Sequence, residues 1–284
     1  MILPYPSILR IDYKAMEGQD IRDLIFSRVE KEKYLAHLSA QGEGVLSGTG
    51  WLKKACENLG IRLRTCKKGG TIIRPSEIIA ILEGYAKQMA SGEEELIGWI
   101  SKASGIATAA WMAKKAAGRN LKVVSGAWKK MPFPLKDLVR QAIVDGGIQY
   151  RIVEKPFVYL DKNYVRMLGG VSKALRSIRT LKGYTLVIQL KGEEHGLPRE
   201  TVLAAQGGTD IIMIDTGRKE DIERVDSTLK AKGLRGRLQI AFGGNIRIDD
   251  VKDLKRMPVE IVDIGQAIVD APLLDFRMDI MGKI

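Results

Sequence analysis

YTLVIQLKGEEHGLPRETVLAAQGGTDIIMID, residues 184–215, contains the repeating unit that decides the fold. Two short apolar runs, YTLVIQL (184–190) and DIIMID (210–215), enclose a helical pattern that closes in two glycines. A strand, a helix and a strand of these lengths form a βαβ unit, whose two strands lie parallel in one sheet. Both runs are apolar at successive positions, which is typical of strands that are covered on both faces.

The same unit recurs throughout the second half of the chain. Helical patterns separate most of the apolar runs, and several of these patterns end in glycine, as helix C-termini often do. Six or seven such units favour an incomplete parallel α/β barrel over an open sheet. The other expected strands are LKVVSGA (121–127), IQYRIV (148–153), FVYLD (157–161), LQIAFG (238–243) and EIVDIG (260–265).

The first half follows a different pattern. Short apolar runs and glycine-rich turns surround one expected helix, LKKACENL (52–59), which indicates a separate α+β unit. A helix at 93–100 is followed by SGIATAAWMAKKAAG, in which Ser104 is the expected N-cap of a second helix. The predicted domains are therefore residues 1–103 and the barrel 104–267, with a tail, 268–284, that returns to the first domain.

Composition narrows the class of protein. The chain has 284 residues, of which 45% are hydrophobic, and its net charge is +12. This charge admits a phosphorylated ligand, an anionic membrane or nucleic acid, but the basic residues are spread out, so nucleic acid is not favoured. The two cysteines form no C-x-x-C pair, and MILPYPSILR at the N-terminus has no long apolar region. We therefore expect neither a zinc site nor a signal peptide, and we expect a cytoplasmic protein without a membrane span.

Ligands of a parallel barrel bind at the C-terminal ends of its strands, so the residues there are the candidate site. They would form one cationic mouth, with glycines that let backbone N–H groups approach a phosphate. Asp215 could hold a magnesium–phosphate complex or stabilise a cationic transition state, or it could simply cap a helix. The candidates are Trp128, Lys129, Lys130, Tyr150, Arg151, Lys162, Asn163, Gln189, Asp215, Gly243, Gly244, Asn245 and Gly265.

Three motifs in the first half carry a resemblance to a known family. They are GEGVLSG (42–48), EGYA (83–86) and SGIAT (104–108). With the strand–helix series that follows, the chain resembles quinolinate phosphoribosyltransferase, also called carboxylating nicotinate-nucleotide pyrophosphorylase. It is also similar to the relatives of that enzyme encoded with molybdate transport systems. The resemblance implies an N-terminal α/β sandwich and an incomplete α/β barrel, assembled as a homodimer or a hexamer of dimers.

The resemblance also implies an activity. Members of the family join phosphoribosyl pyrophosphate and quinolinate, with Mg²⁺, to give nicotinate mononucleotide, pyrophosphate and carbon dioxide. Carried over by position, Asp215, Lys129 and Lys162 would be catalytic, with Asp215 also binding the metal. The other candidates would bind substrate.

Several family motifs are altered in this chain. An arginine is replaced by Trp128 and a histidine by Tyr150, and these aromatic groups can stack on a flat ring but cannot neutralise a second carboxylate. Lys129, Arg151 and Asp215 are retained. Further changes are Gln189 in place of a glutamate, Asp161-Lys162-Asn163-Tyr164 in place of Lys-Asp-Asn-His, Phe242-Gly243-Gly244 in place of Ser-Gly-Gly, and Glu93-Glu94 in place of Glu-Arg.

Three hypotheses follow from the sequence. The first is a phosphoribosyltransferase that acts on quinolinate or on a less charged aromatic ring. The second is a family fold that binds a nucleotide or phosphorylated ligand without turnover, because fold alone does not determine function. The third is a protein whose basic surface contacts nucleic acid or a partner, which would show as steeply salt-dependent binding.

Overall fold

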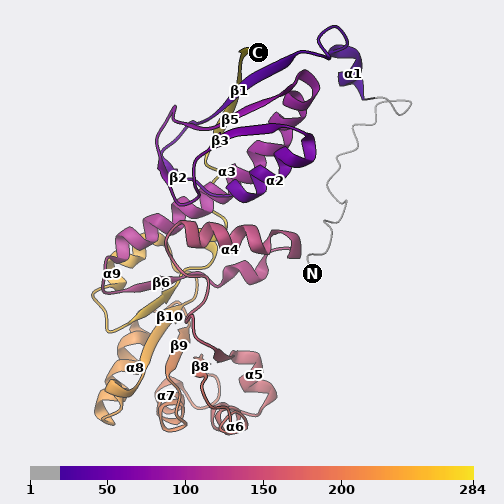
Figure 1. Ribbon diagram of the computed structural model, residues 1–284. Helices are drawn as coiled ribbons and strands as arrows, with labels where there is room; N and C mark the ends of the chain where they lie inside the picture. The colour runs from indigo at the N-terminus through magenta and orange to yellow at the C-terminus, as the bar shows by residue number, and fades with distance from the viewer. Residues whose placement is uncertain (1–19) are drawn as a thin grey trace.

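The computed structural model of the protein describes residues 20–284. MILPYPSILR, where no signal peptide is expected, lies outside the described residues. The described chain forms one unit around an antiparallel sheet and a second around a parallel sheet, with helix α3 running between them (Figure 1). This arrangement confirms the predicted fold class.

The N-terminal unit is a four-stranded antiparallel sheet covered on one face by helices. Its strands are in the order β12-β1-β5-β3, and Leu38 and Leu82 of the sheet pack with Leu52 and Leu96 of the helices. The last strand of the chain, β12, pairs with β1, so the tail belongs to this sheet. The elements are α1 (Ile21–Ile25), β1 (Lys33–Ala40), β2 (Gly44–Val45), α2 (Thr49–Leu59), β3 (Arg62–Cys66), β4 (Ile72–Ile73), β5 (Ile78–Tyr85), α3 (Ala86–Ala117) and β12 (Phe276–Lys283).

The expected helix start at Ser104 is wrong, because α3 continues unbroken through this residue. Ser104 is fully buried, and its hydroxyl accepts a hydrogen bond from the Ser47 N–H at 2.9 Å. Four residues along the helix, the Thr108 hydroxyl accepts from the Val45 N–H, also at 2.9 Å. The motifs GEGVLSG and SGIAT therefore contact each other and tie the loop around β2 to the helix.

The second unit is a six-stranded sheet in which all neighbouring strands run parallel. The strand expected at 148–153 is wrong: only Gln149 pairs, in a single bridge to Val124, and Tyr150 then packs against a helix instead of extending the ladder. The barrel therefore has an open seam between its outer strands. In sheet order, the strands are β6 (Lys122–Val124), β11 (Ile261–Asp263), β10 (Gln239–Gly243), β9 (Ile211–Asp215), β8 (Thr185–Leu190) and β7 (Phe157–Leu160).

Helices cover the outer face of the parallel sheet, and α7 and α8 lie side by side there (Figure 1). Outward residues such as Ile212 and Ile240 belong to the large core shared with these helices, whereas Ile211 and Ala241 belong to a small core inside the barrel. The remaining elements are η1 (Ala127–Lys130), η2 (Phe133–Leu135), α4 (Lys136–Asp145), α5 (Lys162–Met167), α6 (Val171–Ser177), α7 (Leu197–Gln206), α8 (Glu220–Ala231), η3 (Arg235–Arg237), η4 (Ile248–Asp250), α9 (Val251–Leu254) and α10 (Gln266–Val269).

The alternation of side chains along a strand places polar groups inside the barrel at its C-terminal edge. Ile211 and Met213 of β9 point inward, so Asp215, two residues further on, also points inward. By the same count, Gln189 follows Val187 on β8 and Asp263 follows Ile261 on β11. The interior is therefore apolar in the middle and polar at this edge.

Candidate functional site

Asp215 is the centre of a connected group of polar side chains. The Gln189 side-chain amide donates to the Asp215 carboxylate, and the Gln189 side-chain oxygen accepts from the main-chain N–H of Lys162 at 2.8 Å. The Lys191 ammonium lies 2.8 Å from the Asp215 main-chain oxygen and 3.4 Å from its carboxylate. The structure thus joins the Asp215 and Gln189 side chains and the Lys162 main chain, with the Lys191 ammonium beside Asp215. The catalytic and binding roles of these residues stay predictions.

Asp263 is a second inward carboxylate, which the sequence candidates do not include. Asp263 lies on β11 and Asp215 on β9, the two strands that flank β10. The β10 residue between the two carboxylates is Gly243, which has no side chain. The Asp263 carboxylate accepts from the Gly126 N–H at 2.9 Å. Burial raises its pKa, while this hydrogen bond and the Lys129 charge act against the rise. Counting every second residue along EIVDIG would have identified Asp263.

The raised pKa of Asp263 predicts a pH-dependent gain of stability in Asp263→Asn. A carboxyl whose pKa is raised by folding binds protons more tightly in the folded state, so its ionisation destabilises the protein above that pKa. The amide oxygen of asparagine can still accept from Gly126. We expect the variant to have the larger free energy of unfolding at pH 7, and the difference to shrink as the pH falls toward 4. Urea denaturation of both proteins across this range checks it, and a difference that does not change with pH would contradict it.

Lys129 and Lys130 lie in η1, directly after β6, and both are exposed. The Lys129 ammonium lies 5.4 Å from the centroid of the Tyr159 ring on β7. Tyr159 is an inward residue that the candidates also omit. Burial, and then the charges of Asp263 and Asp215, raise the pKa of its phenol, which stays neutral. The Lys129 side chain therefore begins on the β6 side of the seam, and its ammonium lies over the Tyr159 ring on the β7 side.

Trp128 of η1 and Tyr150 form a separate aromatic cluster. Their rings meet edge to face at 6.0 Å, and the Trp128 indole N–H donates to the Tyr150 carbonyl at 2.8 Å. The Arg140 guanidinium of α4 lies 4.5 Å from the Trp128 ring centroid, and that of Arg151 lies 5.4 Å from Tyr150. This cluster provides flat apolar faces and two guanidinium groups.

The glycine turn after β10 is shaped by a close approach of two loops. Gly244 has a φ of 100°, and a Cβ there would lie 2.6 Å from the Gly217 nitrogen. Asn245 follows in the left-handed region with a φ of 59°. Gly265 lies at the same edge, immediately before α10. The close approach to Gly217 therefore explains why residue 244 is a glycine. The same turn places main-chain atoms at the mouth of the barrel.

A hollow of about 370 Å³ opens next to the group of polar side chains around Asp215. Lys162, Gln189 and Lys191 line one side of it. Asn163 is the next residue of α5 and is exposed. Glu200 also lines the hollow, and its buried carboxylate accepts from the N–H groups of residues 192 and 194, both at 2.9 Å, and so fixes the loop after β8.

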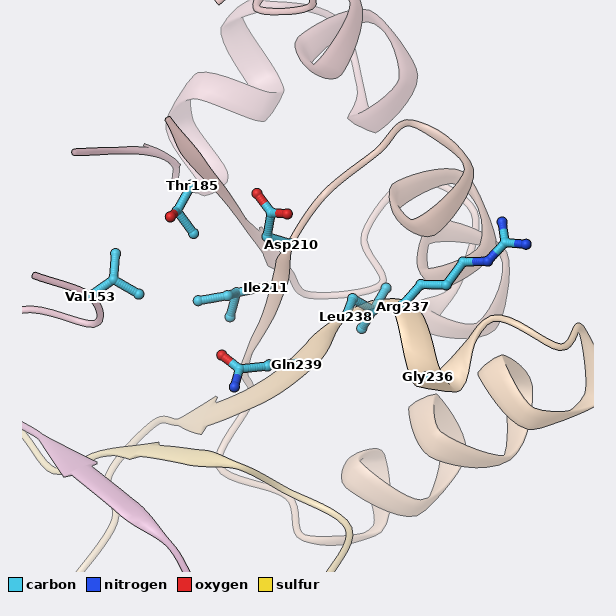
Figure 2. Close-up of a pocket in the computed structure, with 8 residues that line it drawn as sticks. All are labelled: Val153, Thr185, Asp210, Ile211, Gly236, Arg237, Leu238 and Gln239. Carbon is cyan, nitrogen blue, oxygen red and sulfur yellow. The ribbon is translucent and has the colours of Figure 1, made fainter. Parts of the chain in front are cut away.

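A second hollow, of about 350 Å³, lies at the opposite end of the barrel strands (Figure 2). Its residues come from the starts of β8, β9 and β10, from η3 and from Val153 ahead of β7. The Asp210 carboxylate accepts from the Leu186 N–H at 2.8 Å, and Arg237 points away from the other lining side chains. None of the candidate residues lines this hollow, and its one carboxylate has a structural role.

Residues 20–284 contain no group of three or more His, Cys, Asp or Glu side chains placed to hold a metal ion by themselves. No helix in the same range is long and apolar enough to cross a membrane.

Comparisons with known proteins agree with this geometry. Two family models match: "Quinolinate phosphoribosyl transferase, N-terminal domain" over residues 23–104 and the C-terminal domain of the same description over 106–279. The probable carboxylating nicotinate-nucleotide pyrophosphorylase of Archaeoglobus fulgidus is 28% identical over 87% of this chain and 94% of its own. The corresponding human protein is 26% identical over 87% of this chain and 82% of its own. The crystal structure of NadC from Streptococcus pyogenes has a TM-score of 0.77 at 22% identity, covering 92% of this chain and 90% of that one.

Proposed function

The chain belongs to the quinolinate phosphoribosyltransferase family, and from this premise we propose that it transfers phosphoribose from phosphoribosyl pyrophosphate to quinolinate. The products are nicotinate mononucleotide, pyrophosphate and carbon dioxide. The observation that carries the proposal is the mouth of the barrel, where the Asp215 carboxylate lies with the Gln189 amide and the Lys191 ammonium, and the Lys129 ammonium lies over the Tyr159 ring.

The charges of this mouth suit the reaction. When the bond between ribose C1 and pyrophosphate breaks, positive charge develops on the ribose ring and negative charge on the leaving group. Asp215 supports the first and Lys129 supports the second, because charges placed to face developing charge stabilise a transition state. The ring nitrogen of the acceptor then forms the new bond at C1.

The acceptor side of the proposal rests on the aromatic cluster. Trp128 and Tyr150 offer faces on which a pyridine ring can stack, and Arg151 beside them offers a charge for one carboxylate. The exposed Lys162 provides a cation for the second carboxylate of quinolinate.

Magnesium would reach this site with the donor. Mg²⁺ is usually held by one or two carboxylates together with substrate phosphates and water, and Asp215 with Asp263 across Gly243 fits that mode. The ion would neutralise charge on the diphosphate. The residues therefore fit a metal that arrives with its substrate better than a resident metal.

We further propose a homodimer in the cytoplasm. Large apolar side chains are exposed in the elements that follow β6 and β7, notably Phe133 of η2 at 82% and Met167 of α5 at 75%, and a second copy of the chain would cover them. Both cysteines, Cys56 and Cys66, are free thiols, which fits a reducing compartment.

The test is pyrophosphate release by the purified chain, given Mg²⁺ and phosphoribosyl pyrophosphate. Parallel reactions contain quinolinate, nicotinate or no acceptor. Release that requires quinolinate supports the proposal. Release that requires nicotinate instead would assign the aromatic cluster to a ring with one carboxylate. If the donor binds and no acceptor gives release, the chain is a binding protein.

A further inference from the structure

The Lys129 side chain spans the open seam of the barrel. It leaves η1 after β6, one outer strand of the sheet, and its ammonium lies 5.4 Å from the ring centroid of Tyr159 on β7, the other outer strand. Among the described residues, these two strands share no ladder, and only the bridge between Val124 and Gln149 continues the sheet from β6 into the seam. The Lys129 ammonium thus lies across the gap in the mouth.

Tyr159 is suited to hold this cation. A lysine ammonium over an aromatic face within about 6 Å of its centroid is attracted to the ring, and the attraction grows when water is excluded. Tyr159 faces the polar edge of the barrel interior, near the carboxylates of Asp215 and Asp263. The ring therefore holds the ammonium on the side of the mouth where the acids lie.

The backbone of the same lysine is fixed by a different strand. The Asp263 carboxylate on β11 accepts from the Gly126 N–H at 2.9 Å, and the Gly126 carbonyl accepts from the Lys129 N–H at 3.3 Å. The turn is therefore attached to β11, while the end of the side chain rests on β7. Lys130, the next residue, is also exposed and makes a matched comparison.

We propose that Tyr159 is a positioning residue, which holds the Lys129 ammonium inside the mouth as part of the binding site for the diphosphate of the donor. The inference rests on the proposed function for the identity of that anion. An ordered lysine does not have to be immobilised when the anion binds, so it binds more tightly than a freely moving one.

The position of Lys129 can be tested without any ligand. Lysine side chains of the full chain are labelled by reductive ¹³C-methylation, and the Lys129 signal is identified by its loss in Lys129→Arg. We expect this signal to be shifted upfield by the aromatic ring, to stay shifted in Tyr159→Phe, and to return among the exposed lysines in Tyr159→Leu. A Lys129 signal that lies among the exposed lysines in the unmodified sequence would overturn the proposal.

The role in anion binding is tested with magnesium pyrophosphate as the probe, by calorimetry. We expect Tyr159→Leu to weaken binding about fivefold, the effect of one cation–π contact, and Tyr159→Phe to restore it. In a Lys129→Met background the leucine change should have no further effect, whereas in Lys130→Met the fivefold loss should persist. Equal losses in both backgrounds, or none, would overturn the proposal. If pyrophosphate binding follows this pattern but no nucleotide forms, the positioning role of Tyr159 stands and only the proposed function is contradicted.

Discussion

Asp215→Asn is expected to lower kcat for pyrophosphate release by at least about 100-fold. Removing one fixed group that faces developing charge typically costs this much. Asparagine has nearly the same shape, and its oxygen can still accept from the Gln189 amide, so the change removes charge and little else. Steady-state kinetics with saturating donor and quinolinate measure the effect.

The matched control is Asp210→Asn, at the other end of the same strand. Its carboxylate accepts from the Leu186 N–H, which an amide oxygen can also do, and it lies at the opposite end of the barrel. We expect its kcat to stay within about twofold of the unmodified protein, in line with surface changes away from a site. Full activity in Asp215→Asn would remove Asp215 from the mechanism.

Gly105→Ala is expected to lower the free energy of unfolding by about 3 kcal/mol or more. A Cβ on Gly105 would lie 2.0 Å from the backbone oxygen of Pro272. That backbone cannot move freely, because the Leu274 N–H donates to the Ser101 carbonyl on the same helix. Overpacking against fixed atoms costs about 1–3 kcal/mol and occasionally more. Urea denaturation measures the loss.

Gly98→Ala on the same helix is the control. Gly98 is exposed, and a Cβ there would meet no atom within 4 Å. Alanine favours a helix over glycine by about 1 kcal/mol, so this variant should be slightly more stable. Equal stability of the two variants would contradict the close contact between α3 and the segment that leads to β12.

The strands could be predicted from sequence because their apolar runs are short, bounded by glycines and repeated. The continuity of α3 could not, because serine at position 104 suits a helix start equally well. Its hydroxyl instead contacts the Ser47 backbone, 57 residues earlier in the chain, and sequence spacing does not show such a partner. The seam after Gln149 was missed for the same reason, since Tyr150 packs with Trp128 and Arg140 rather than extending the strand.

The candidate site was predicted in part. Listing the ends of the strands named Asp215, Gln189 and Lys162, which the structure joins by hydrogen bonds, Lys162 through its main chain; their roles in the site stay predictions. It overlooked Asp263 and Tyr159, because a list of strand ends does not consider which face each residue occupies. Their inward position follows from the alternation along β11 and β7, once the two cores show which face is the interior.

The most direct test of phosphoribosyl transfer is detection of its product. The full chain is incubated with Mg²⁺, phosphoribosyl pyrophosphate and quinolinate, and the mixture is analysed by liquid chromatography and mass spectrometry. The account predicts nicotinate mononucleotide in a one-to-one ratio with pyrophosphate. Pyrophosphate without mononucleotide, or neither product from a chain that still binds the donor, would contradict it.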